Sequence, residues 1–346
     1  MNVKAVRSAR FWEDEGCYPD GVPFHTSGST GQPRCIVLPK EALLLSARAV
    51  NEWLGAGADA VWGLALPIDH VGGFGVVARA HAAGCGFSRY QGKWDARKCA
   101  GWLRESCVTH LSLVPTQLHD LLGAGMEAAP SLRAVVVGGG RLPDEMGQAA
   151  RDAGWPVLAS YGMTETCSQV ATQALDSLGL PFAEAPLQLL PIWDAELSDA
   201  GLLRLRGDAL FSGTITDGGF RRREGDWFTT NDRVELSART VRPLGRSDSL
   251  VKVMGELVDL DGIEARLGRL CGERGKSVAV IAVPDTRKEH ALIAVFEGEA
   301  LPSAVDDYNR QAPGPERISR CHVVTGFPRS DMGKLLRASL AGMCGQ

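Results

Sequence analysis

Short apolar runs alternate with amphipathic stretches through the first half of the chain, and this alternation constrains the fold more than any other feature. Two of the apolar runs end at Pro67 and Pro115, and a third ends at a triple glycine. Between them lie stretches with helical spacing, such as the Ala- and Leu-rich residues 40–54. Strands that alternate with helices are typical of a largely parallel sheet covered by helices. We therefore expect an α/β fold.

The expected elements divide the chain into a large and a small domain. The large domain has strands at 35–39, 61–66, 110–114, 132–137 and 157–160, and helices at 40–54, 73–83, 94–105, 116–122 and 143–153. Short strands and glycine turns at 196–232 indicate a small β subdomain at about 186–245. The small domain has helices at 263–270, 304–311 and 334–341 and strands at 277–284, 291–297 and 322–324. We expect a large N-terminal domain at 1–245 and a small mobile α+β domain at 246–346.

Composition argues against several classes of protein. The chain has 346 residues, 45% of them hydrophobic, and a net charge of −4, which gives no sign of a nucleic-acid or anionic-membrane surface. Its nine cysteines are scattered and lack a Cys-x-x-Cys pair, so neither a zinc site nor a disulfide framework is expected. Reduced thiols, with no signal peptide and no apolar membrane span, favour a cytoplasmic protein.

Residues 26–34 read Thr-Ser-Gly-Ser-Thr-Gly-Gln-Pro-Arg and are rich in groups that contact anions. Glycines let the backbone approach a ligand closely, and consecutive backbone N–H groups form anion-binding nests. Hydroxyl groups add rotatable donors for phosphate oxygens. The spacing is not that of a Walker P-loop. Taken alone, the stretch is equally consistent with a flexible polar turn and with a polyphosphate cradle.

Further segments follow this loop in a set order along the chain. They are Pro-Ile-Asp-His-Val-Gly-Gly-Phe-Gly at 67–75, the glycines at 138–140, Tyr-Gly-Met-Thr-Glu-Thr-Cys-Ser at 161–168, Gly-Asp-Trp-Phe-Thr-Thr-Asn-Asp at 225–232, Gly-Arg-Ser-Asp at 245–248 and Pro-Arg-Ser-Asp-Met-Gly-Lys at 328–334. With residues 26–34, they resemble the ordered core motifs of the adenylate-forming acyl-CoA synthetase superfamily over residues 26–340. The 161–170 segment, and His70 with Arg79 nine residues later, resemble the o-succinylbenzoate–CoA ligases of menaquinone biosynthesis.

The resemblance implies a two-step ligase reaction. A carboxylate attacks the α-phosphorus of ATP, and the thiol of CoA then displaces AMP from the acyl-adenylate, with Mg²⁺ at the phosphates. The implied partners are a small carboxylic acid, ATP and CoA. Two alternatives remain at this point: another aryl or short-chain acyl-CoA synthetase, or a non-catalytic AMP- or acyl-binding relic.

The resemblance also implies roles for individual residues. Those expected to bind ATP are Thr26, Ser27, Gly28, Ser29, Thr30, Gly31 and Arg34 at the phosphates, Gly138, Gly139, Gly140, Tyr161 and Gly162 around adenine, and Asp232 and Arg246 at the ribose. Glu165 is expected to bind Mg²⁺, and Thr164 to contact the α-phosphate. Lys334 is expected to stabilise charge on the transferring phosphoryl group, and Asp248 to act as the hinge of the C-terminal domain.

Ordinary structural roles compete with several of these assignments. Thr164 and Glu165 suit the acidic first turn of a helix, and glycines after a strand suit a tight turn. Lys334, outside its motif, is simply a solvated lysine. His70 is expected to gate the acyl pocket. Arg79 lies on an apolar helix and needs a partner, which is either a substrate carboxylate or an acid such as Asp69.

Two departures from the superfamily pattern affect these expectations. The phosphate loop begins at residue 26, so we expect most of the N-terminal lobe that precedes it in the superfamily to be absent here. We expect a homo-oligomer or a partner to cover the exposed face. The segment Val-Met-Gly-Glu-Leu-Val at 253–258 also departs from the usual motif near the pantetheine tunnel, which weakens the CoA assignment relative to adenylation.

Overall fold

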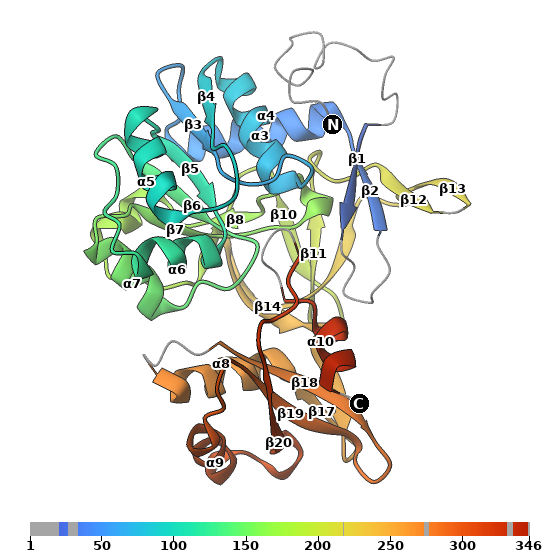
Figure 1. The fold of residues 1–346 in the computed structure, drawn as a ribbon. Helices are drawn as coiled ribbons and strands as arrows, with labels where there is room; N and C mark the ends of the chain where they lie inside the picture. The colour runs from blue at the N-terminus through green and yellow to red at the C-terminus, as the bar shows by residue number, and fades with distance from the viewer. Residues whose placement is uncertain (1–20, 27–33, 217, 273–276, 331–334, 345–346) are drawn as a thin grey trace.

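The computed structural model describes residues 21–26, 34–216, 218–272, 277–330 and 335–344. Five parallel strands form one half of its largest sheet, in the order β7-β6-β5-β3-β4. They are β3 (Val61–Leu64), β4 (Gly86–Arg89), β5 (His110–Leu113), β6 (Ala134–Val137) and β7 (Val157–Tyr161). Helices lie around this sheet (Figure 1): α3 (Lys40–Leu54), α4 (Val71–Ala83), α5 (Ala96–Glu105), α6 (Pro115–Gly123) and α7 (Asp144–Asp152).

Antiparallel strands extend the same sheet beyond β7. In spatial order they are β8 (Ala171–Thr172), β9 (Leu187–Leu189), β15 (Thr240–Arg246), β14 (Phe228–Ser237), β11 (Leu202–Arg206) and β10 (Asp194–Leu197), and the short helix η2 (Leu175–Gly179) follows β8 in the chain. A second sheet has the order β1-β2-β12-β13, with β1 (Val22–Thr26), β2 (Arg34–Leu38), β12 (Gly213–Thr216) and β13 (Gly219–Arg222). The strands at about 186–245 are therefore shared between two sheets that also include earlier parts of the chain.

The C-terminal part builds smaller sheets of its own. The hairpin β16 (Leu250–Val253) and β17 (Glu256–Asp259) precedes α8 (Leu260–Cys271), and a three-stranded sheet follows with β18 (Val278–Asp285), β19 (Glu289–Glu297) and β20 (Ile318–Val324). The remaining elements are α9 (Pro302–Gln311), η5 (Gly314–Glu316) and the closing helix α10 (Arg337–Cys344). Figure 1 shows these elements in orange and red below the rest of the molecule.

Buried apolar side chains fall into three clusters that follow this division. One large cluster draws on residues between Val22 and Val241, and two smaller ones draw on residues between Val253 and Cys344. The β5 and β6 strands are buried along their whole length, as expected for parallel strands covered on both faces. In the described part of the chain, no helix has the length and apolar character needed to cross a membrane.

The expected α/β class is confirmed, and the helix at 40–54 has its predicted bounds because Gly55 terminates it in the left-handed region at φ 63°. Among the strands, β1, β4, β8 and both strands of the β16–β17 hairpin were not expected. β4 reads Gly-Phe-Ser-Arg, a short polar sequence with little strand character, and it forms only because its backbone pairs with β3.

Candidate active site

Tyr161, Asp232 and Arg246 meet although they come from three strands. The Tyr161 hydroxyl donates to Asp232 Oδ2 at 2.5 Å, and Arg246 Nη1 donates to Asp232 Oδ1 at 3.2 Å. Asp232 and Arg246 lie opposite each other in the β14–β15 register. Burial, followed by the charge of Asp232, raises the pKa of Tyr161 well above its usual value. The structure thus brings together three residues expected at the nucleoside end of the site.

Glu165 lies beside this trio, in the short helix η1 (Thr164–Thr166) that also holds Thr164. Its backbone carbonyl accepts a hydrogen bond from Phe211 N at 2.9 Å, which fixes the turn. Burial raises the pKa of the Glu165 carboxyl, while the charges of Arg246 and Arg34 oppose that rise. A half-buried carboxylate near two guanidinium groups is a hard-oxygen ligand suited to Mg²⁺.

The segment around Gly162 is closely packed. A Cβ at Gly162 would lie 1.5 Å from the Ser168 carbonyl oxygen, so only glycine fits there. Cys167 and Ser168 have φ values of 55° and 100°, which turn the chain back toward Gly162. Gly138 packs against β7, because a Cβ on Gly138 would lie 3.4 Å from the carbonyl oxygen of Ser160 in that strand.

The predicted phosphate loop connects two paired strands. Thr26 ends β1 and Arg34 begins β2, and they are opposite each other in the antiparallel register. Ser27, Gly28, Ser29, Thr30 and Gly31 lie outside the described residues, as does Lys334. Asp248 belongs to the turn η3 (Ser247–Ser249) between β15 and β16.

The acyl end of the predicted site is built on α4. His70 is the residue that precedes this helix, and its carbonyl accepts from Phe74 N at 2.9 Å. Arg79 is only 2% exposed; its Nη1 donates to Ser112 Oγ at 3.1 Å, and its guanidinium lies 5.1 Å from the centroid of the Trp62 ring. A Cβ on Gly75 would lie 3.4 Å from Arg79 Nη2 and 3.8 Å from Ser168 Cβ, so α4 and the segment after Gly162 approach each other here.

Arg79 has no carboxylate within ion-pair distance among the described residues. Asp69, the internal partner considered above, is exposed, whereas Arg79 is buried. Burial alone lowers the pKa of Arg79 to about 10. The contacts of Trp62 and Ser112 with Arg79 were not foreseen, because the sequence shows each of them only as part of a buried strand.

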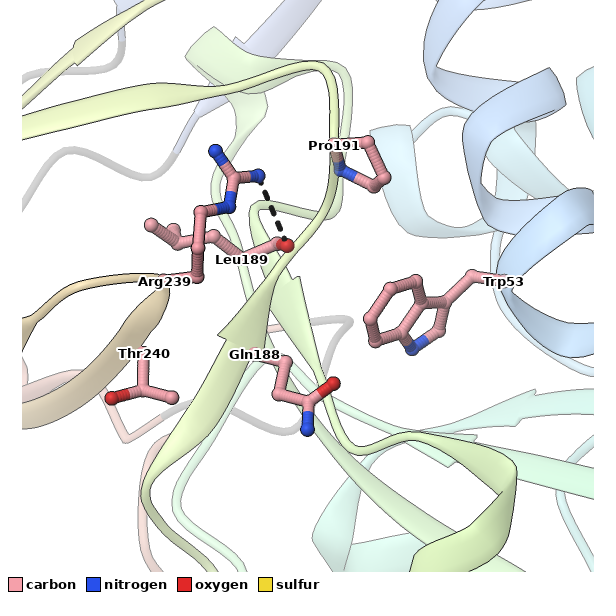
Figure 2. A pocket seen from close by; sticks show the side chains of 6 residues that line it. All are labelled: Trp53, Gln188, Leu189, Pro191, Arg239 and Thr240. Carbon is pink, nitrogen blue, oxygen red and sulfur yellow. Dashed lines mark hydrogen bonds between the residues drawn. The ribbon is translucent and has the colours of Figure 1, made fainter.

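Among the described residues, no group of three or more His, Cys, Asp or Glu side chains could hold a metal ion. A surface hollow of about 420 Å³ lies between α3 and β9, and none of its lining residues belongs to the predicted set (Figure 2). Its one charged lining residue, Arg239, donates to the carbonyls of Leu189, Leu190 and Trp193.

Comparison with known proteins agrees with this geometry. A family model described as AMP-binding enzyme matches residues 22–213. A 2-succinylbenzoate–CoA ligase of Enterococcus faecalis is 30% identical over 330 residues, which cover 90% of this chain and 67% of that protein. The ligase of the same name from Escherichia coli is 31% identical over 281 residues, which cover 79% of this chain and 57% of that protein.

Solved structures of similar fold include the same kind of ligase. The o-succinylbenzoate CoA synthetase MenE from Bacillus subtilis, in complex with the acyl-adenylate intermediate OSB-AMP, has a TM-score of 0.78 at 23% identity and covers 92% of this chain and 68% of its own. An E. coli MenE variant with bound OSB-AMS has a TM-score of 0.76 at 26% identity, covering 93% of this chain and 68% of its own. The chain spans between about half and two thirds of these relatives, and it belongs to the family of AMP-binding enzymes.

Proposed function

We propose that this protein is an ATP-dependent acid–thiol ligase that converts o-succinylbenzoate and CoA into o-succinylbenzoyl-CoA, AMP and pyrophosphate, a step of menaquinone biosynthesis. Its named relatives are 2-succinylbenzoate–CoA ligases. The observation that carries the proposal is the buried Arg79 without a protein carboxylate among the described residues. A buried, unpaired guanidinium is costly, and a substrate carboxylate would neutralise it through two parallel hydrogen bonds.

In the first step, the reacting carboxylate oxygen forms a bond to the α-phosphorus of ATP, and the bond to the pyrophosphate oxygen breaks. Thr164 would contact the α-phosphate, and residues 26–31 with Arg34 would hold the β- and γ-phosphates. Lys334 would stabilise the charge that develops on the transferring group. Asp232, which accepts hydrogen bonds from Tyr161 and Arg246, would also accept hydrogen bonds from the ribose hydroxyls.

In the second step, the CoA sulfur forms a bond to the acyl carbon, and the bond from that carbon to the AMP oxygen breaks. The thiol proton passes to solvent. His70, at the start of α4, would close the acyl pocket against water, which competes with the thiol for the acyl carbon. Gly138, Gly139, Gly140 and Gly162 would border the adenine.

Mg²⁺ fits the carboxylate of Glu165. Mg²⁺ is usually bound in proteins by one or two carboxylates together with waters and substrate phosphates, so a single half-buried acid at this point is sufficient. When bound, it supplies positive charge that neutralises the phosphate oxygens. Burial raises the pKa of Glu165 in the ligand-free protein, and a bound cation would favour its ionised form.

The two-domain arrangement is also part of the proposal. We infer an adenylation domain at 1–245 and a mobile domain at 246–346 that turns about Asp248 between the two steps. The separate apolar clusters on either side of this point support that division. The described cysteines are all free thiols, which supports a cytoplasmic location. The protein is proposed to act as a homo-oligomer.

The deciding experiment measures pyrophosphate release with o-succinylbenzoate and with benzoate, which lacks the succinyl carboxylate. Arg79→Met removes the charge but keeps an apolar side chain of similar length. It should raise KM for o-succinylbenzoate by roughly 10- to 100-fold, the loss expected for one charged hydrogen-bonded contact, and leave KM for benzoate nearly unchanged. Arg79→Lys tests whether a positive charge without the guanidinium geometry is sufficient to bind the succinyl carboxylate.

Lys334→Ala is the matched control, because it should slow adenylation of both acids by the same factor. If Arg79→Met weakened both acids equally, the carboxylate-binding role of Arg79 would be wrong. If the wild-type protein released no pyrophosphate with any acid of a broad panel, the ligase proposal itself would be wrong, and the relic alternative would stand.

A further inference from the structure

Two buried side-chain atoms in the described part of the chain have no hydrogen-bond partner, and both belong to residues that contact Arg79. They are Asn51 Oδ1 and Trp62 Nε1. Asn51, on α3, donates from Nδ2 to the Arg79 carbonyl at 2.8 Å, and the Arg79 guanidinium lies 5.1 Å from the centroid of the Trp62 ring. Unpaired buried polar atoms are rare in native proteins, and each needs a physical reason. Both of these atoms lie beside the residue proposed to bind the substrate carboxylate.

Trp62 is fully buried on β3, and its neighbour in the sheet is a neutral ring. It lies opposite His110 of β5 in the parallel register, with ring centroids 5.2 Å apart. His110 is held by Thr109 Oγ1 at 2.8 Å and by the Leu54 carbonyl at 3.1 Å. Burial lowers the pKa of His110, which keeps it uncharged. His110 therefore adds no second cation beside the Trp62 ring.

Packing alone does not explain an indole at position 62. A phenylalanine would also fill apolar space and would bury no N–H group, whereas the N–H of Trp62 is buried without an acceptor. The other fully buried tryptophans, Trp155 and Trp193, donate their N–H groups to the carbonyls of Met126 and Gln169. What an indole offers beyond a phenyl ring is a more negative face, which attracts cations more strongly than that of any other aromatic side chain.

Arg79 also differs from other arginines that contact a tryptophan. Arg206 lies 4.9 Å from the centroid of the Trp227 ring, but it is exposed and forms an ion pair with Asp194 at 2.8 Å. Arg79 is buried, and among the described residues its side chain donates only to Ser112 Oγ. The aromatic ring beside Arg79 thus stands where a buried arginine usually has a carboxylate.

An aromatic face and a carboxylate stabilise a buried cation with different consequences for binding. A protein carboxylate would neutralise Arg79 and compete with a substrate carboxylate for the same N–H donors. A ring face attracts the cation without supplying a negative charge, so the guanidinium keeps its net charge and its remaining donors. That charge is then available to an acid that enters the pocket.

Building on the proposed function, we propose that Trp62 is a positioning residue whose ring holds the Arg79 guanidinium, without neutralising it, for the second carboxylate of the substrate. Asn51 fixes the backbone of Arg79 from α3, and Ser112 accepts one hydrogen bond of the guanidinium. Trp62 thereby favours dicarboxylic over monocarboxylic substrates, because only a second carboxylate gains from the charge that the ring preserves.

The test replaces Trp62 alone with mono-, di- and trifluorotryptophan. Fluorine atoms leave the shape of the indole nearly unchanged and weaken the attraction of its face for a cation. In the pyrophosphate-release assay, KM for o-succinylbenzoate should rise stepwise along the series, to about tenfold, while kcat and KM for benzoate change by less than about twofold. In the Arg79→Met background the same series should leave KM for o-succinylbenzoate unchanged, because the cation is gone.

Trp155→Phe is the matched control, because Trp155 is also fully buried but its Nε1 donates to the Met126 carbonyl at 2.8 Å. It should lower the Tm more than Trp62→Phe, which breaks no hydrogen bond of the indole, and it should leave KM for both acids unchanged. Trp62→Phe should raise KM for o-succinylbenzoate alone, by about threefold.

A constant KM for o-succinylbenzoate along the fluorinated series would overturn the role of Trp62, and so would an equal rise for both acids. If Arg79→Met failed to separate o-succinylbenzoate from benzoate, the carboxylate-binding role of Arg79 would be wrong and the role of Trp62 would fall with it. If Arg79→Met separated the two acids and the fluorinated series had no effect, only the role of Trp62 would be rejected.

Discussion

Two charged side chains at the site are held in surroundings that favour their neutral forms. Burial lowers the pKa of Arg79 to about 10 and raises the pKa of Glu165, although Arg246 and Arg34 partly offset the second shift. Both effects destabilise the ligand-free fold, because a buried charge loses hydration. Sites that bind charged ligands commonly retain such a cost, since the ligand supplies the missing partner.

Glu165 should make the stability of the ligand-free protein depend on pH. Its folded pKa lies above the ordinary value of 4.5, so the stability it contributes is complete below that pH and is lost as the pH rises through the folded pKa. Glu165→Gln removes this titration. The variant should melt a few degrees above the wild type at about pH 8 and equal it at about pH 4.

Thermal unfolding without ligands from acid to mild alkali measures this difference. Glu52→Gln, on the exposed side of α3, serves as the control and should follow the wild type at every pH. Addition of Mg²⁺ and ATP should raise the Tm of the wild type more than that of Glu165→Gln. A variant that melts below the wild type at high pH would contradict the role given to burial.

At the scale of elements, glycines set how closely α4 approaches the loop before it. A Cβ on Gly73 would lie 2.2 Å from the Pro67 carbonyl oxygen, a distance that no side chain tolerates. The contact fixes the turn that carries His70 and, six residues beyond Gly73, the position of Arg79. The helix is therefore located by a backbone contact rather than by its own sequence preference.

Gly73→Ala should destabilise the protein by about 3 kcal/mol, because either the loop or α4 must move. Gly101→Ala, on α5, is the matched control: its Cβ would meet nothing within 4 Å, and removing a helix-interior glycine should stabilise by about 1 kcal/mol. Denaturant unfolding of both variants measures the change in the free energy of unfolding, which should fall for Gly73→Ala and rise for Gly101→Ala. If both substitutions changed the stability equally, helix propensity and not the close contact of Gly73 with Pro67 would determine the effect at α4.

At the scale of the whole molecule, a partly buried arginine organises the C-terminal domain. Arg337, at the start of α10, donates to Asp261 Oδ1 at 2.5 Å, to Glu264 Oε2 at 2.7 Å and to the Val280 carbonyl at 2.6 Å. Asp261 also accepts from Ser249 Oγ at 2.6 Å, next to the proposed hinge. One ion-pair network thus joins the hinge turn, α8, β18 and the closing helix.

Arg337→Met should destabilise this domain alone, by about 2 kcal/mol, because two carboxylates lose their counter-charge at a partly exposed site. Hydrogen exchange should quicken in β18, β19 and α8 and stay unchanged in β5 and β6. Arg310→Met, which removes an exposed ion pair of α9, should change neither region. Loss of protection in both regions together would mean that the chain unfolds as one unit, against the proposed division at about residue 245.

Some features of the fold could be predicted because they depend on local sequence. The α/β class followed from alternating patterns, and α3 had its expected bounds because apolar spacing and a terminal glycine act within the helix itself. β4 was missed because edge strands form by pairing with a neighbour that lies far along the chain. The strands at 186–245 read as a separate unit, but their partners include β1 and β2 at the start of the described chain.

The sequence by itself determined the alternating architecture, the order of the motifs and the residue types available at the site. Tertiary structure decided which of these residues meet: Tyr161 with Asp232, and Arg79 with Trp62 and Ser112. It also decided that Arg79 is buried while Asp69 is exposed, with no ion pair between them among the described residues, a point that the sequence left open. The physical reason is that periodicity records burial, whereas ionic and hydrogen-bonded partners depend on strand order and register, which long-range pairing sets.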